Sequence, residues 1–238
     1  MRSSPASGPN DPNSGARLIL GGMDAVLLDL YDTIARTHWG QLSERITAEL
    51  GIDKRDLFRA YELTRAARGV GIYGSIEGDM TAIVEAVGVD PDPILIQRLL
   101  GMEREFSETG VELWEDSLPV VRELRARGTK TALISNCSHS TRPIVDRLGI
   151  GEEFEEILLS FEVGMHKPDA GIYREALRRL GYVAPERAVF VDDQQVYCDG
   201  AAALGIQTFL IDRSGDGTPD LNGHRVIRDL RALLSVDA

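Results

Sequence analysis

The stretch Ala25–Thr33, AVLLDLYDT, decides the fold. Its apolar half is nearly continuous and too short for three helical turns, which is typical of a strand buried on both faces of a parallel sheet. Such a strand delivers Asp29 to its carboxyl end, where open α/β sheets bind their ligands. An Asp at this place can equally cap the turn that follows, so this stretch alone leaves both roles open.

Three later stretches carry polar side chains at comparable positions. The first is an apolar run that ends in a hydroxyl and an amide, the second places a lysine directly before a proline that starts a helix, and the third is a buried run that ends in two carboxylates. These stretches are Thr131–Asn136 (TALISN), His166–Asp169 (HKPD) and Ala188–Asp193 (AVFVDD). If their strands are neighbours in a parallel sheet, the polar ends meet at one edge.

Together the four stretches resemble the motifs of the haloacid dehalogenase superfamily of hydrolases: a strand-end Asp, a strand-end Ser or Thr, a Lys and an acidic pair, in this order. The resemblance implies the capped subfamily, in which a helical cap is inserted after the first core strand. It implies that Asp29 is a nucleophile whose aspartyl intermediate is hydrolysed by water. Ser135 would hold a phosphoryl oxygen, and Lys167 would neutralise charge between Asp29 and the transferred group.

A metal site is expected at the same edge. The carboxylates of Asp29, Asp192 and Asp193 would lie within a few ångströms of one another, which is costly unless a cation compensates them. Mg²⁺ held by carboxylates and waters is the usual solution beside phosphate. The resemblance implies Asp29, Asp193 and the backbone carbonyl of Tyr31 as ligands, with Asp192 beside them. The acidic pair could instead cap the helix that follows.

Two positions depart from the pattern of superfamily phosphatases. These enzymes carry a second Asp two residues after the nucleophile as general acid and base, and here that place is Tyr31. Without the carboxyl, expulsion of an alkoxide should be slower by ~10²–10⁴-fold, although a tyrosine of pKa about 10 could donate. Asp32 is expected to point away because the strand end is extended. Tyr197 replaces the acidic or Asn residue four places after Asp193, which weakens the outer shell of the metal site.

Tyr31 also resembles the haloacid dehalogenases proper, in which halide leaves without a proton; Thr33, Asn136 and Tyr173 fit that pattern too. The fit fails at the acidic pair, because those enzymes have small neutral residues there and use no metal. We therefore expect a Mg²⁺-dependent phosphatase that acts on a small phosphorylated metabolite. A 2-haloacid dehalogenase is the first alternative, and a degenerate, non-catalytic binding protein is the second.

Substrate contacts are expected from both parts of the chain. Thr33 and Asn136 lie beside the motifs, and Arg68 and Tyr73 lie in the cap. The two cap residues belong to a segment broken by glycines, residues 68–74 (RGVGIYG), which could reach down to the site or be an ordinary turn. Arg68 could bind an anionic group or lie on a solvated helix face.

The remaining pattern predicts an α/β fold, a doubly wound parallel (Rossmann-like) sheet with an inserted all-helical cap. Helical spacing from Thr37 predicts about four cap helices, and later helices and strands alternate, as a parallel sheet with helices on both faces requires. The expected later strands are 130–135, 156–159, 188–191 and 207–211, and the helices are 118–127, 141–148, 170–180 and 200–204. The expected parts are a disordered tail (1–22), a core (23–36 and 115–238) and the cap (37–114).

Composition limits the partners. A chain of 238 residues with 43% hydrophobic residues is ordinary for a soluble globular protein, and no apolar run is long enough to cross a membrane. The tail lacks the basic start and apolar block of a signal peptide. The net charge of −12, without a basic patch, disfavours nucleic acid. Cys137 and Cys198 are expected as free thiols in a reducing cytoplasm. Oligomeric state is not indicated.

Overall fold

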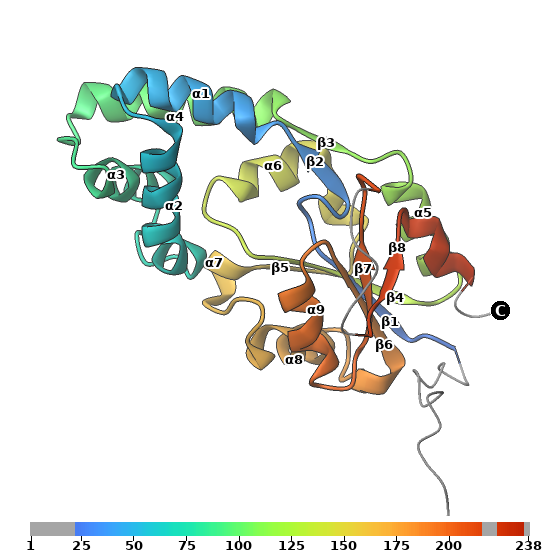
Figure 1. Cartoon of the computed structure of the whole chain (residues 1–238). Helices are drawn as coiled ribbons and strands as arrows, with labels where there is room; N and C mark the ends of the chain where they lie inside the picture. Colours follow the sequence, from blue (N-terminus) through green and yellow to red (C-terminus); the bar gives the residue numbers. More distant parts are fainter. Residues whose placement is uncertain (1–21, 216–222, 236–238) are drawn as a thin grey trace, which may run out of the picture.

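The computed structural model describes residues 22–215 and 223–235. The tail expected over residues 1–22 lies outside the described residues, apart from Gly22. Figure 1 shows an α/β core and, at its upper left, a group of helices that belongs to the first half of the chain.

Six strands form one parallel sheet in the order β5-β4-β1-β6-β7-β8, which confirms the predicted fold class. The strands are β1 (Ala25–Leu28), β4 (Lys130–Ser135), β5 (Glu156–Leu159), β6 (Ala188–Asp192), β7 (Gln207–Ile211) and β8 (Arg225–Ile227). From β1 the chain moves outward through β4 to β5 and then returns to the other side of β1 for β6. The strand order therefore reverses between β1 and β6, and the carboxyl ends there form the crevice in which such sheets bind ligands.

The side chains of β1 alternate between two apolar layers, as the pleat of a strand requires. Val26 and Leu28 belong to one layer, and Ala25 and Leu27 belong to the other; all four are fully buried. The first layer contains α5 (Ser117–Ala126), α6 (Thr141–Leu148) and the C-terminal turn Leu230–Ser235, and the second contains α8 (Ala170–Arg179) and α9 (Gln195–Ala202). The sheet is thus covered on both faces, which explains why its strands read as continuous apolar runs.

The cap consists of α1 (Trp39–Leu50), α2 (Lys54–Gly69), α3 (Ile76–Ala86) and α4 (Pro93–Thr109), which share an apolar cluster of their own. The sequence marks where two of these helices begin. Asp53 accepts a hydrogen bond from the Asp56 amide at 2.9 Å, and Asp92 accepts one from the Ile94 amide at 2.9 Å, with Pro93 as the first helical residue.

The chain passes between the core and the cap through two short strands that the sequence analysis did not predict. β2 (Ala35–Thr37) and β3 (Val111–Leu113) pair antiparallel, and the Arg36 guanidinium donates to Glu112 across the pair at 2.5 Å. Strands of three residues are too short to show an alternation of apolar and polar side chains. The two covalent connections of the cap therefore lie side by side.

Several other elements differ from the sequence-based expectation. Helix α9 begins at Gln195, earlier than the expected residue 200, because the Asp192 carboxylate accepts a hydrogen bond from the Gln194 amide at 2.8 Å and turns the chain into the helix. The short helix α7 (Ser160–Val163) and the edge strand β8 were not predicted either. Both contain only three or four residues, which is below the length at which periodicity is visible.

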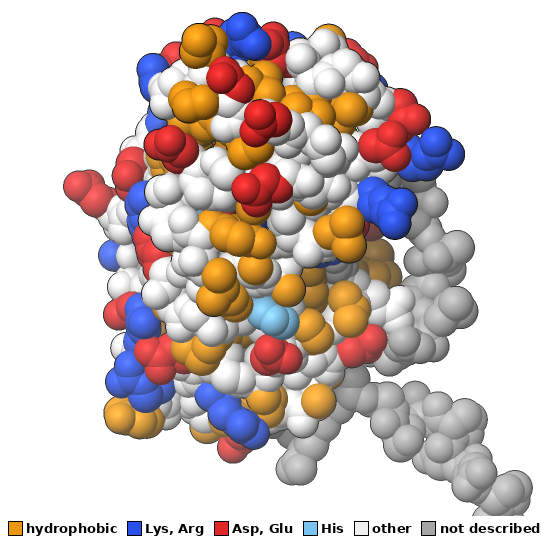
Figure 2. Space-filling model, turned by 90° about the vertical axis from the view of Figure 1, so that its left-hand side faces the viewer, with side chains coloured by type: hydrophobic (Ala, Val, Ile, Leu, Met, Phe, Trp, Pro, Cys, Tyr) orange, Lys and Arg blue, Asp and Glu red, His pale blue; other side chains and the backbone are white. Residues whose placement is uncertain are grey.

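Among the described residues, no helix combines the length and the apolar character needed to span a membrane. Both cysteines are free thiols, as expected. Figure 2 shows the face formed around α2, α3 and α7, where acidic and basic side chains are interspersed and hydrophobic side chains gather at the middle.

Candidate active site

The carboxyl ends of three neighbouring strands bring the predicted polar residues together. Asp29 follows the last residue of β1, Ser135 ends β4 and Asp192 ends β6. The Asp29 amide donates to the Val191 carbonyl at 3.0 Å, so the nucleophile candidate is held against β6 by the backbone. Lys167 comes from the loop between α7 and α8 and joins them at this edge.

Lys167 lies at the centre of the site and is buried. Its Nζ donates to Asp29 Oδ1 at 2.5 Å and to Asp192 Oδ2 at 2.6 Å. Burial alone would lower the pKa of Lys167, but the charges of the two carboxylates and their hydrogen bonds outweigh it and raise that pKa. The ammonium group is therefore a permanent positive charge between the two carboxylates.

Asn136 holds the backbone of Lys167 and so sets its position. The Asn136 amide group donates to the Lys167 carbonyl at 2.8 Å, and the Asn136 carbonyl oxygen accepts from the Lys167 amide at 2.8 Å. Asn136 also lines the cavity described below. The Asn136 side chain, which was predicted to contact the substrate, is already engaged by this pair of bonds. In this structure it supports the backbone of Lys167.

Three carboxylates crowd the same edge. Asp29, Asp192 and Asp193 each offer an oxygen, and these oxygens all lie within 4.8 Å of one another. Burial and the neighbouring carboxylates raise the pKa of Asp29 to about 7, against the effect of Lys167, and they raise that of Asp193 to about 8. One lysine among three carboxylates leaves an excess of negative charge. These hard oxygen donors fit a divalent cation such as Mg²⁺.

The turn after Asp29 differs from the expected extended strand. β1 ends at Leu28, and Asp32 adopts a left-handed backbone with a φ of 57°, so the expectation that Asp32 points away as part of a strand is wrong. Asp32 contributes to raising the pKa of Asp193, which places the two carboxyls near each other. The Tyr31 hydroxyl lies 3.0 Å from Thr141 Oγ1, and burial raises the pKa of this hydroxyl well above its usual value.

Ser135 and Thr33 are both buried, yet they are placed differently. The Ser135 hydroxyl ends β4 beside Asp29 and makes no hydrogen bond of standard geometry to any residue in the described part of the chain, which leaves it available for a substrate oxygen. Thr33 does not line the cavity; its carbonyl accepts from the Arg213 guanidinium at 2.6 Å, and Arg213 in turn pairs with the buried Asp116. The Thr33 backbone thus belongs to the framework of the loop, whereas its hydroxyl, like that of Ser135, has no hydrogen-bond partner of standard geometry among the described residues.

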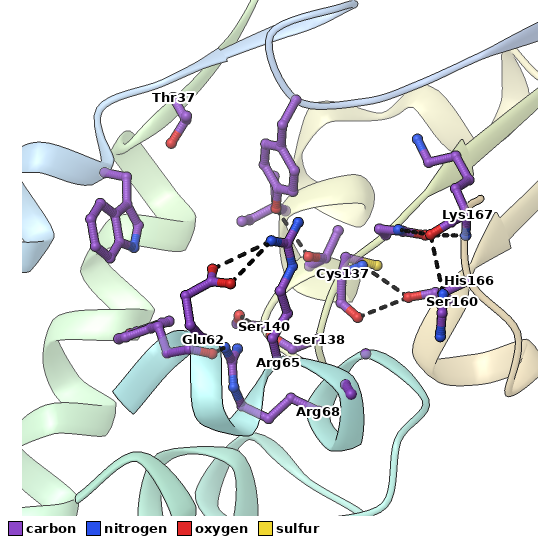
Figure 3. A pocket seen from close by; sticks show the side chains of 18 of the residues that line it. Thr37, Glu62, Arg65, Arg68, Cys137, Ser138, Ser140, Ser160, His166 and Lys167 are labelled. Atoms are coloured by element: carbon purple, nitrogen blue, oxygen red, sulfur yellow. Dashed lines mark hydrogen bonds and ion pairs between the residues drawn. The ribbon is translucent and has the colours of Figure 1, made fainter. Parts of the chain in front are cut away.

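A cavity of about 590 Å³ lies between the cap and the core and reaches Lys167 (Figure 3). Its core wall includes Tyr31 and Asn136. Its cap wall is formed by side chains of α1, α2 and α4, most of them aromatic or aliphatic, and includes Trp39, Leu42, Phe58, Tyr61, Glu62, Arg65, Arg68, Glu103 and Phe106. A cavity of this size accommodates a small organic molecule.

Of the two predicted cap contacts, one faces this cavity. Arg68 belongs to the wall, where its guanidinium donates to Thr64 Oγ1 and to the Tyr61 carbonyl, both at 3.0 Å. Tyr73 lies in the loop between α2 and α3 and is not among the described residues that line the cavity. The substrate contact expected for Tyr73 stays a prediction that this cavity does not support.

The glycine-broken segment does reach the core. Gly71 has a φ of +77°, and a Cβ at this position would lie only 2.4 Å from the Phe161 carbonyl oxygen of α7. Only glycine permits both the backbone conformation and the close approach. A second contact joins cap and core, because Arg65 donates to the Tyr197 hydroxyl at 3.0 Å, and the Tyr197 ring lies 4.9 Å from Lys167 Nζ.

Three parts of this arrangement were not predicted from the sequence. Tyr197, expected only as a weakening of the metal site, places its ring over Lys167. His139, for which no role was expected, has its Nδ1 2.8 Å from Asp79 Oδ2 of the cap. The third part is Glu103. The signal for Glu103 was present, since a carboxyl occupies the buried stripe of α4 that otherwise carries Ile96, Leu99 and Ser107.

The sequence comparison agrees with this geometry. The family model of haloacid dehalogenase-like hydrolases matches residues 23–205, which include every strand-end residue described above. The chain belongs to the haloacid dehalogenase-like hydrolase family. Among curated relatives of this hydrolase is glyceraldehyde 3-phosphate phosphatase of Methanothermobacter thermautotrophicus, which is 40% identical over 178 residues, covering 72% of this chain and 77% of the relative.

Solved structures show the same fold at lower identity. The 2-haloacid dehalogenase of Pseudomonas syringae superposes with a TM-score of 0.68 at 22% identity, covering 90% of this hydrolase and 97% of that chain. A haloacid dehalogenase family enzyme of Bacteroides thetaiotaomicron, solved with magnesium and inorganic phosphate, superposes with a TM-score of 0.65 at 19% identity, covering 84% and 98%. Phosphatases and dehalogenases thus share this architecture, and the side chains of the site must distinguish them.

Proposed function

We propose that this hydrolase is a Mg²⁺-dependent phosphatase of the capped subfamily that cleaves a small phosphorylated metabolite through an aspartyl phosphate on Asp29. The observation that carries the proposal is the cluster of three carboxylates around a single buried lysine. Asp192 already accepts from Lys167 and from the Gln194 amide, and Asp193 adds a further carboxylate to this cluster, which is costly unless a cation compensates it. The relatedness to glyceraldehyde 3-phosphate phosphatase supports a phosphate ester as substrate.

The side chains of the site have complementary roles in this reaction. The Asp29 carboxylate attacks phosphorus, the bond to the leaving oxygen breaks, and water then hydrolyses the acyl phosphate and restores Asp29. Lys167 stabilises the negative charge that the phosphoryl oxygens bring to Asp29, and the Ser135 hydroxyl donates to one of these oxygens. The residues that would hold Mg²⁺ are Asp29, Asp193 and the Tyr31 carbonyl, beside Asp192; the bound ion would neutralise phosphoryl charge.

We expect phosphate release from p-nitrophenyl phosphate in Mg²⁺ and none in EDTA. The aryl leaving group needs little acid assistance, so the absence of an Asp at position 31 cannot conceal an otherwise intact site. Mg²⁺ should also raise the melting temperature of the protein, because it binds the folded site, and Asp193→Asn should reduce this shift.

Two other outcomes would contradict the proposal. Halide release from 2-chloropropionate, unaffected by EDTA, would indicate the dehalogenase that Tyr31 favours. If neither reaction occurs and Mg²⁺ does not change the melting temperature, the protein is a non-catalytic binding protein. A phosphorylated small molecule as the natural partner and the cytoplasm as its compartment remain predictions from the sequence.

Tyr31→Asp tests the meaning of the tyrosine in the acid position. The buried Tyr31 hydroxyl has a raised pKa and contacts Thr141, so it is a weak proton donor. We expect the variant to raise kcat/KM for alkyl phosphates relative to p-nitrophenyl phosphate by at least about tenfold, since a carboxyl acid helps poor leaving groups most. Tyr31→Phe is the control and should leave this ratio unchanged. A ratio that Tyr31→Asp does not alter would show that the missing acid does not limit the reaction.

A further inference from the structure

Glu103 is a buried carboxyl in the cap wall of the cavity that reaches Lys167. It comes from α4, is 9% exposed, and forms no ion pair with any residue in the described ranges. Burial raises the pKa of Glu103 to about 7; Arg68 and the Tyr61 hydroxyl oppose this effect, and Asp79 adds to it. The carboxyl is therefore short of positive charge in a chamber built to receive a ligand.

The other charged groups around Glu103 already have partners. Arg68 donates to Thr64 Oγ1 and to the Tyr61 carbonyl; its charge lowers the pKa of Glu103, but the two side chains form no ion pair in the described part of the chain. Asp79 is paired with His139 on the core side. Glu103 interacts with the Tyr61 hydroxyl but has no ion-pair partner among the described residues, so a positively charged group that enters the cavity would find a carboxyl able to accept a charge-assisted hydrogen bond.

The Tyr61 ring beside Glu103, together with the Trp39 ring that packs against Tyr61, favours the same kind of ligand. Trp39 and Tyr61 line the cavity with their rings at right angles and 5.4 Å apart, and the Arg68 guanidinium already lies 4.8 Å from the centre of the Tyr61 ring. Cations bind over aromatic faces, most strongly over Trp. A carboxylate beside such rings is chemically suited to an organic ammonium group.

We propose that Glu103, with the ring of Trp39, binds a cationic amine carried by the leaving group of the substrate. The proposal rests on the proposed phosphatase function: the phosphate end would lie at Lys167 and the amine end at α4. The substrate class is then a phosphomonoester of an amine-bearing alcohol or phenol, and the cavity of about 590 Å³ has room for a leaving group of this kind.

Two non-hydrolysable phosphonates of equal shape test the amine site without turnover. These are 4-(aminomethyl)benzylphosphonate and its neutral counterpart 4-(hydroxymethyl)benzylphosphonate, titrated into the Mg²⁺-loaded protein by calorimetry. We expect the ammonium ligand to bind about tenfold more tightly than the neutral one, as a charged hydrogen bond in a buried site provides. Glu103→Gln should reduce this ratio to about one, because it keeps the size of the side chain and removes the charge.

Glu62→Gln is the matched control, since Glu62 lines the same cavity but is paired with Arg65 at 3.3 Å, as Figure 3 shows. It should leave the ratio unchanged. If Glu103→Gln fails to fold, Trp39→Leu provides the second variant and should lower the ratio severalfold. A ratio near one in the wild type, or a tenfold ratio that survives Glu103→Gln, would overturn the amine site.

The same preparations separate this proposal from the phosphatase function. Turnover of p-nitrophenyl phosphate, which carries no amine, reports on the catalytic residues alone. Turnover without a preference for the ammonium ligand contradicts only the amine site, whereas a preference without any turnover contradicts only the phosphatase function. Equal loss of turnover for all substrates in Glu103→Gln would show that Glu103 acts in the chemistry, and this too would overturn the amine site.

Discussion

Asp29→Asn should abolish phosphate release from p-nitrophenyl phosphate, by at least about 10⁴-fold in kcat, because an amide cannot replace the attacking carboxylate. The side chains are nearly equal in size, so the fold should persist. Burial and the neighbouring carboxylate raise the pKa of Asp29, which means that its charged form is disfavoured in the metal-free protein. Loss of that charge should therefore leave the melting temperature in EDTA unchanged or slightly higher. Steady-state turnover and thermal unfolding measure the two effects.

Asp32→Asn provides the matched control. Asp32 lies three residues further along the same turn and is exposed, and its left-handed backbone is one that Asn also tolerates. We expect its activity to stay within about tenfold of the wild type, which is the range of indirect charge effects. If Asp29→Asn retained more than a small fraction of the activity, or if both variants lost it equally, Asp29 would not be the nucleophile.

Lys167→Met should damage both catalysis and stability. Removal of the ammonium group takes away the charge that faces the phosphoryl group, and we expect kcat to fall by at least about 10³-fold. It also leaves Asp29 and Asp192 buried without their common partner, which should cost about 3–5 kcal/mol of unfolding free energy in EDTA. Mg²⁺ should restore part of this stability, because it supplies positive charge to the same carboxylates. Chemical unfolding in EDTA and in Mg²⁺ measures the difference.

Lys54→Met serves as the control for Lys167→Met. Lys54 pairs with Glu44 on the surface of the cap, where both side chains are exposed to solvent. Exposed ion pairs contribute little, so stability and activity should not change measurably. If Lys167→Met were as stable as the wild type in EDTA, the buried carboxylates would not depend on the lysine, and the electrostatic argument for a cation site would fail with it.

The core was predictable because its signals are local. The strands Lys130–Ser135, Glu156–Leu159 and Gln207–Ile211 and the helix Thr141–Leu148 have the predicted bounds. Each strand is a short apolar run between turns, and the helix starts and stops at residues with clear preferences. The ribbon of β2 and β3 carries no comparable signal, since strands of three residues are stabilised by their pairing with each other.

The strand-end residues of the site were predictable for a related reason. Parallel strands that are neighbours must present their carboxyl ends at one edge, so Asp29, Ser135 and Asp192 meet once the strand order is right. Contacts between the cap and the core depend on how two separately packed units lie against each other. Sequence spacing does not contain that relation, which is why Glu103 was overlooked and why Tyr73 was expected near a cavity that it does not line.

The ribbon of β2 and β3 has a consequence for how this enzyme can diversify. Everything that we assign to substrate choice, from Trp39 to Glu103, lies on one uninterrupted length of chain between the two ribbon strands, and the strand-end residues that perform the chemistry lie outside it. Insertions, deletions or replacements in this segment of the chain can therefore change the substrate specificity without changing the residues that cleave the phosphate ester. The part of the enzyme that selects the substrate is thus joined to the reaction centre by covalent connections at one place only, and its other contacts with the core are non-covalent.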